Sequence, residues 1–143
     1  MRFELIEDHF PVIFIALSGE MQPQQVLQLI RFVDRMRERA AAERVDLLTI
    51  CDARGAARPG ELVRDMLVDW LRHELFGTPS PLGSIIVCRD PLVRGVIASI
   101  KWATGHSHIQ VVPTPDEALA RGRERFAQLG LTLPASLEPD DND

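Results

Sequence analysis

The sequence predicts an α/β protein with a single mixed, mostly parallel sheet of about five strands, covered by about four helices. Short apolar runs alternate with longer amphipathic segments after the N-terminus, giving the order β-β-α-β-α-β-α-β-α. This alternation is typical of right-handed βαβ units and hence of parallel strands. The first two strands are separated by a connection too short for a crossover, which predicts an antiparallel strand at one edge.

The opening strands are predicted at residues 2–7 and 12–18, joined by a turn at 9–11. The second of them, "VIFIALS", is continuously apolar, as expected for a strand buried on both faces. A helix of about twenty residues follows, because Pro23 is tolerated in a first helical turn and apolar residues then recur at helical spacing. The stripe consists of Val26, Leu29, Ile30, Val33, Met36 and Ala40.

The middle of the chain contains a buried strand at 45–52, "VDLLTICD", and a second amphipathic helix. Its predicted stripe comprises Leu62, Val63, Met66, Leu67, Trp70 and Leu71. The helix is expected to end near Gly77, because Pro79 and Pro81 block its continuation.

The last third repeats this pattern twice. A strand at 83–88 precedes a helix that Asp90 caps and Pro91 begins. A strand at 108–112 precedes a helix capped by Thr114, with Glu117 completing a capping box. The inner face of this last helix is predicted to comprise Ala118, Leu119, Gly122, Phe126 and Leu129.

The length of the chain limits the number of domains, and its net charge limits the classes of partner that it can bind. The 143 residues suit one domain, predicted at 1–133, and the acidic residues 134–143 are expected to form a disordered tail. The net charge of −5 lacks the basic footprint of a nucleic-acid-binding protein. The apolar run 12–17 is too short to span a bilayer, and the N-terminus lacks a signal-peptide pattern, so we expect a cytoplasmic protein without membrane insertion.

The most informative segment is "LLTICDARGAARPGELVRDML" at 47–67, where a strand is expected to end at Asp52 and a charged loop leads into the second helix. Loops at the carboxyl ends of strands carry function in many α/β proteins. Backbone N–H groups at the helix start could also hold an anion. The candidates for partner or anion binding are Asp52, Arg54, Arg58, Glu61, Arg64, Trp70 and Phe76. Phe76 is either part of a docking patch or part of a packed helix end, and the sequence does not decide between them.

Several kinds of chemical site are disfavoured. Asp52 lacks the acidic pair and the lysine that a phosphoacceptor site needs, and the loop lacks the Lys-Ser/Thr of a phosphate-binding loop. His106 and His108 supply only two of the ligands of a metal site. Cys51 and Cys88 occur without a Cys–His signature, and buried thiols are expected instead. We therefore expect no enzyme activity, no cofactor and no metal.

Four short motifs, taken in order, resemble the STAS superfamily and more closely its SpoIIAA-like, or STAS/SEC14-type, small bacterial proteins. A strand ends in Leu17-Ser18-Gly19-Glu20-Met21, and the next ends in Asp52. "IIVCRDP" at 85–91 and "VVPTPDEAL" at 111–119 match the third helix opening and the last strand–helix junction. The resemblance extends over residues 3–130 and implies a protein-interaction module.

In the anti-sigma-factor-antagonist branch, this resemblance also implies a phosphorylatable serine or threonine at the start of the second helix. Residues 53–75 contain neither, so the usual switch is not expected. The leading hypothesis is a non-enzymatic regulatory module that binds a protein partner or a second copy of itself. The alternative is a sensor of a small ligand (nucleotide, lipid or phosphometabolite) that uses the same loop.

Overall fold

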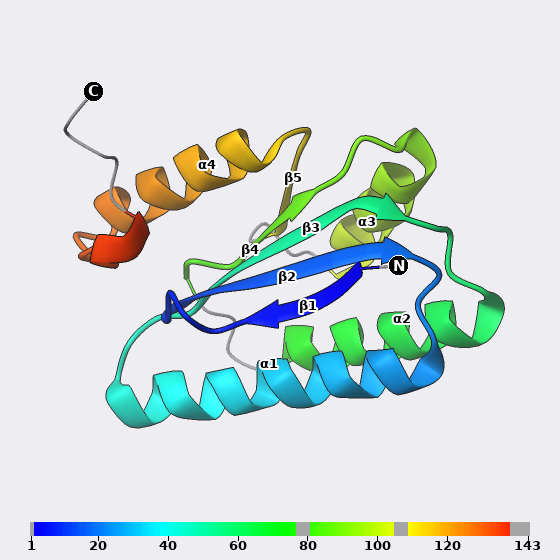
Figure 1. Cartoon of the computed structure of the whole chain (residues 1–143), viewed down its shortest axis with the longest axis horizontal. Coiled ribbons are helices and arrows are strands. Elements are labelled where there is room, and N and C mark those ends of the chain that lie inside the picture. Colours follow the sequence, from blue (N-terminus) through cyan, green and yellow to red (C-terminus); the bar gives the residue numbers. More distant parts are fainter. Residues whose placement is uncertain (1, 77–80, 105–108, 138–143) are drawn as a thin grey trace.

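The computed structural model describes residues 2–76, 81–104 and 109–137, which form one five-stranded sheet with four helices (Figure 1). The strands are β1 (Arg2–Ile6), β2 (Val12–Gly19), β3 (Leu48–Ala56), β4 (Ser84–Val87) and β5 (Ile109–Val112). The helices are α1 (Pro23–Glu43), α2 (Glu61–Phe76), α3 (Pro91–Thr104) and α4 (Pro115–Gln128). The predicted fold class and element order are confirmed.

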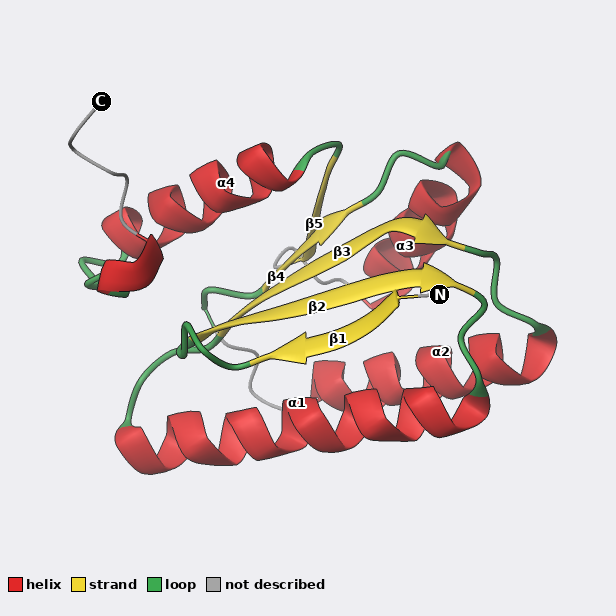
Figure 2. Cartoon of the chain, viewed as in Figure 1, coloured by secondary structure: helices red, strands yellow, loops and turns green. Residues whose placement is uncertain are grey.

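The strands lie in the sheet in the order in which they occur in the chain. β1 pairs antiparallel with β2 at one edge, as predicted, and β2 to β5 are parallel. Sequential parallel strands with right-handed crossovers place the connecting helices on one face of the sheet. α1 and α2 accordingly lie together beneath the sheet, α3 contacts α2, and α4 covers the opposite face (Figure 2).

The alternation of side chains along β2 produces two separate cores. Ile13 and Ile15 are buried against α1, whereas Val12 is buried on the face that α4 covers. On that second face Ala118 and Phe126 of α4 pack against β3 to β5. Because both faces of β2 are buried, its sequence is continuously apolar, which is the pattern that predicted this strand.

The helix caps follow from the sequence. The Thr114 hydroxyl accepts a hydrogen bond from the N–H of Glu117 at 3.2 Å, and Asp90 Oδ1 accepts one from the N–H of Leu92 at 2.9 Å. Both bonds satisfy N–H groups that a helix start leaves without partners, and both caps are confirmed.

Three of the predicted apolar stripes need correction. α1 buries Phe32 in addition to most of its predicted stripe. Leu62 of α2 is 63% exposed and Leu129, at the end of α4, is 46% exposed. Each of the two leucines lies at the margin of a stripe, where helical periodicity does not distinguish a buried position from an exposed one.

The predicted strand end at Asp52 is wrong, because β3 continues to Ala56. The register with β2 runs on to Gly19 opposite Ala56, and the N–H of Ala57 still donates to the carbonyl oxygen of Gly19 at 3.0 Å. A bulge in β3 accompanies this extension, because the two-residue step from Ala16 to Ser18 in β2 pairs with the three-residue step from Asp52 to Gly55 in β3. The apolar pattern stops before the hydrogen-bonded ladder does, because the last residues of β3 carry charged or small side chains.

The packed chain also extends beyond residue 133. Residues Ala135–Leu137 form a short 3₁₀ helix, and Leu133 and Leu137 pack against the α4-side core. Ser136 Oγ lies 2.7 Å from Nδ1 of His9, and Arg123 donates to the carbonyl oxygen of Leu137 at 3.1 Å. The expected disordered tail therefore does not begin at residue 134, and its last six residues, 138–143, lie outside the described residues.

Among the helices of the described chain, none combines the length and the apolar character that crossing a membrane requires.

Candidate functional site

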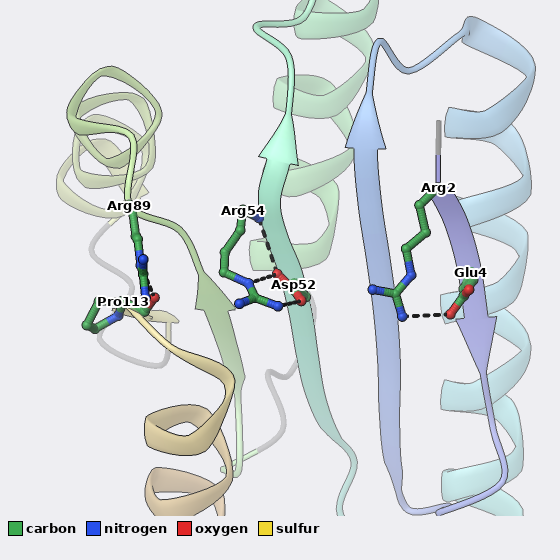
Figure 3. Close-up of polar contacts among 6 residues, drawn as sticks. All are labelled: Arg2, Glu4, Asp52, Arg54, Arg89 and Pro113. Atoms are coloured by element: carbon green, nitrogen blue, oxygen red, sulfur yellow. Dashed lines mark hydrogen bonds and ion pairs between the residues drawn. The ribbon is translucent and has the colours of Figure 1, made fainter.

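Asp52 and Arg54 form an ion pair on β3, where the sequence predicts a loop. Arg54 Nε donates to Asp52 Oδ1 at 2.9 Å and Nη2 donates to Oδ2 at 2.8 Å, and the Arg54 backbone N–H donates to Oδ1 at 3.2 Å (Figure 3). Arg54 lies in the irregular part of β3 between Asp52 and Gly55, and these three hydrogen bonds bring the two residues together. The hydrogen bonds from Arg54 lower the pKa of Asp52 and raise the pKa of Arg54. The pair therefore stays charged at neutral pH.

This pair lies on the face of the sheet that α4 partly covers, because Asp52 follows Leu48 and Ile50 at strand spacing and both of these pack in the α4-side core. α2 lies on the opposite face. The sequence predicts one surface from Asp52 into the second helix, and the sheet divides these residues between its two faces.

Trp70 faces the core rather than solvent. It is half-buried and packs, together with Leu67, against the core formed by β2 and α1. An amphipathic helix on a sheet directs its apolar stripe inward, so the large side chain that suggested a docking patch serves the α1–α2 contact. Phe76 is the last residue of α2, and its side chain lies outside the described ones.

The other three candidates are exposed at the start of α2. Arg58 lies before the helix, Glu61 is its first residue, and Arg64 follows in the first turn. The Arg64 guanidinium lies 3.8 Å from the Asp65 carboxylate, with both side chains more than half exposed. Such a pair contributes little to stability and leaves these groups accessible to a partner.

Two leucines are exposed at the starts of α2 and α3, and the sequence predicts one of them, Leu62, to lie in a buried stripe. Leu62 is 63% exposed in the first turn of α2, and Leu92 is 54% exposed in the first turn of α3. Because β3 and β4 are neighbouring parallel strands, the helices that follow them begin at the same edge of the sheet. The signal was present in the sequence, as an apolar residue directly after each helix start. We refer to Arg58, Glu61, Leu62, Arg64 and Leu92 as the α2–α3 edge.

Arg89 connects the ends of β4 and β5 close to this edge. Its Nε donates to the carbonyl oxygen of Pro113 at 3.0 Å (Figure 3). The bond joins the segment that leads into α3 to the segment that leads into α4, and it holds the two strand ends together.

Both cysteines, which are potential nucleophiles, lie within the described residues. Burial raises the pKa of the Cys51 thiol to about 12, so this thiol is protonated at neutral pH and is a poor nucleophile. Cys88 is buried, and no group of three His, Cys, Asp or Glu side chains within the described ranges is arranged to hold a metal ion. His106 and His108 lie outside the described residues.

Neither a protein-family model nor a curated protein matches the sequence. The structure, however, is similar to the crystal structure of an anti-sigma factor antagonist from Mycobacterium paratuberculosis. The match has a TM-score of 0.53 and 21% sequence identity, and it covers 85% of this chain and 95% of that chain. At this identity the match establishes the fold alone. The chain therefore has the fold of an anti-sigma factor antagonist, as the STAS-like motifs of its sequence predict.

Proposed function

We propose that this protein is a non-enzymatic regulatory module that binds a protein partner through the α2–α3 edge. Two lines of support come from different sources: the fold is shared with an anti-sigma factor antagonist, and the edge exposes two leucines among charged side chains. The partner we propose is accordingly a protein of the anti-sigma-factor type.

The observation that carries this proposal is the exposure of Leu62 and Leu92 at the starts of neighbouring helices. Water surrounds each of these side chains in the free protein, so covering them releases hydration free energy. Arg58, Glu61 and Arg64, which flank Leu62 in the sequence, supply both signs of charge. An apolar centre with a polar rim is the usual composition of a protein–protein contact.

The sequence at this edge departs from the pattern that the resemblance implies. Residues 53–75, which include the β3–α2 connection and most of α2, contain no serine and no threonine. We propose that binding here is not switched by phosphorylation of a hydroxyl group in this segment, and that the abundance of the partner or an event on the partner controls the complex.

The test first isolates the partner from native cell extract by affinity purification and then measures binding with both proteins purified. We expect Leu62→Asp and Leu92→Asp each to weaken the affinity at least about tenfold, because each buries an unpaired carboxylate in the contact. Leu27→Asp is the matched control, since Leu27 is 45% exposed on α1 and lies outside the edge. Wild-type affinity for both edge variants would refute the proposed surface.

The alternative, a ligand sensor at the same loop, would give a different result. A phosphorylated ligand that binds at the start of α2 would stabilise the isolated protein, by roughly 2.7 kcal/mol at one hundred times its dissociation constant. If a phosphorylated ligand stabilises the protein, if Arg58→Gln abolishes this effect, and if affinity purification retains no partner, the ligand-sensor function would be supported in place of the proposed one.

A further inference from the structure

A hollow of about 270 Å³ lies on the α4 side of the sheet, on the face opposite α1 and α2. α4 makes its main contacts with β3, β4 and β5. The hollow forms where this cover ends, beside Pro115 and Leu119 in the first half of α4. It takes no part in the α2–α3 edge.

The floor of the hollow is apolar. It consists of side chains from four strands and from α4, namely Ile6, Phe14, Ile50, Val87 and Leu119. Ala16 lies among them and is small, so it leaves the space open above β2. A volume of this size is below the usual range for drug-sized ligands and suits a molecule with one apolar side chain.

Two side chains of opposite charge border this floor. Arg2 comes from β1 and Asp52 from β3, and Figure 3 shows both on the same side of the sheet, flanking β2. The Arg2 charge contributes to the lowered pKa of Asp52, although the hydrogen bonds from Arg54 contribute more. The hollow therefore presents a cation and an anion on either side of an apolar cavity.

Both charged groups retain capacity for a ligand. Asp52 Oδ1 accepts two hydrogen bonds from Arg54 and Oδ2 accepts one, and a carboxylate oxygen has two lone pairs. The Arg2 side chain is 54% exposed, and its pair with Glu4, at 3.0 Å, is a surface ion pair that contributes little. A guanidinium can also bind a carboxylate through two parallel hydrogen bonds.

We propose that this hollow binds a zwitterionic small molecule of the apolar α-amino-acid class. The ligand carboxylate pairs with Arg2, its ammonium group donates to Asp52 Oδ2, and its side chain rests on the floor around Phe14. Strands β1 and β3 lie about 10 Å apart, since neighbouring strands are about 4.8 Å apart. A zwitterion with a hydrogen bond of about 2.8 Å at each end spans most of that distance, and the long Arg2 side chain spans the remainder.

The opposite end of the hollow is closed by His9. Its ring contacts Phe14 edge-on with centroids 5.5 Å apart, and its Nδ1 lies 2.7 Å from Ser136 Oγ. The contact with the C-terminal 3₁₀ segment holds this ring in place. The hollow thus has charged side chains at one end and an aromatic side chain at the other. An amphipathic ligand would place its charged groups at the first end and its apolar side chain toward the second.

The test is a titration followed by amide resonances, with L-leucine and L-phenylalanine as probes at millimolar concentration. We expect saturable shifts at β2 around Ala16. Isocaproate lacks the ammonium group, isoamylamine lacks the carboxylate and glycine lacks the side chain. Isocaproate and isoamylamine should each bind at least about tenfold more weakly, because each lacks one of the two charge-assisted hydrogen bonds. Glycine should also bind at least about tenfold more weakly, because it leaves the apolar floor uncovered.

Three variants complete the experiment. Arg2→Gln removes the cation and should weaken leucine binding at least about tenfold, and Ala16→Met fills the hollow and should abolish it. Arg31→Gln is the control, because Arg31 is exposed on α1. The absence of saturable shifts, equal binding of isocaproate or isoamylamine, or equal binding by Arg2→Gln and the control would each overturn the proposal. None of these results depends on the α2–α3 edge.

Discussion

Arg54 binds both carboxylate oxygens of Asp52 from two residues further along the same strand, in a segment that the sequence predicts as a loop. The pair lets β3 continue on a sheet face that α4 does not fully cover. The Asp52 charge would otherwise lie partly desolvated beside the apolar hollow, since this side chain is only 23% exposed.

The Asp52–Arg54 pair makes stability depend on pH in a defined direction. The pKa of Asp52 is lower in the folded protein than in the unfolded chain. Its stabilisation is therefore fully present above the unfolded value of about 4 and is lost as the pH falls through the folded value. We expect Asp52→Asn to cost about 0.5–1 kcal/mol at pH 7, since Arg54 is well exposed.

Urea unfolding of wild type and Asp52→Asn at pH 7 and pH 3 measures this effect. The difference in unfolding free energy should be smaller at pH 3, because the wild-type carboxylate is then closer to protonation. Asp46→Asn, in the connection before β3, is the control, and its effect should stay within about 0.5 kcal/mol. A difference for Asp52→Asn that is the same at both pH values would contradict the role given to the pair.

Gly55 allows β2 and β3 to approach closely at the end of β3. A Cβ atom at this position would lie 2.9 Å from Cβ of Ser18. Gly55→Ala should therefore cost about 1–3 kcal/mol, because one of the two strands must shift. Gly95→Ala in α3 is the matched control: its Cβ meets nothing within 4 Å, and removing a helical glycine should stabilise by about 1 kcal/mol.

Thermal or urea unfolding of the two glycine variants, with Ser18→Gly/Gly55→Ala as a third protein, tests this contact. The double variant should recover part of the loss, because Ser18 no longer carries the opposing Cβ. Ser18→Gly alone is the reference, because it loses the hydrogen bond from the Arg2 N–H to Ser18 Oγ. A loss on Gly55→Ala that is as large in the Ser18→Gly background as in wild type would mean that the close approach is not its cause.

Two neighbouring residues at the start of α2, Val63 and Leu62, should differ in how much they contribute to the unfolding free energy. Val63 is 5% exposed, and Val63→Ala should lower the unfolding free energy by about 1–3 kcal/mol, through lost burial and a cavity. Leu62, 63% exposed, should tolerate alanine within about 0.5 kcal/mol. Urea unfolding of both variants checks this, and a loss at Leu62 as large as that at Val63 would place Leu62 in the core.

The C-terminal 3₁₀ segment should contribute to the stability of the domain. Leu137 packs against the α4-side core, so Leu137→Ala should cost about 1 kcal/mol, less than at a fully buried position. Leu131 is 37% exposed, and its alanine variant should stay within about 0.5 kcal/mol. Equal effects in a urea titration would mean that residues 134–137 do not stabilise the fold, and would restore the domain end predicted at 133.

The sequence by itself determined the order of the elements, the antiparallel edge strand and the caps of α3 and α4. These features depend on local patterns: continuous apolar runs, helical periodicity, and Asp or Thr followed by Pro. These features can be predicted from the sequence because each depends on residues that are close together in the chain.

Only the tertiary structure decided which side chains share a surface. Asp52 and Trp70 lie in one sequence segment, yet the sheet places them on opposite faces, whereas Leu62 and Leu92 are distant in sequence and begin helices at one edge. Arg2 and Asp52 border one hollow because β1 and β3 both flank β2. The physical reason is that strand pairing and the side of the sheet on which each helix packs are non-local, and no periodicity within a segment encodes them.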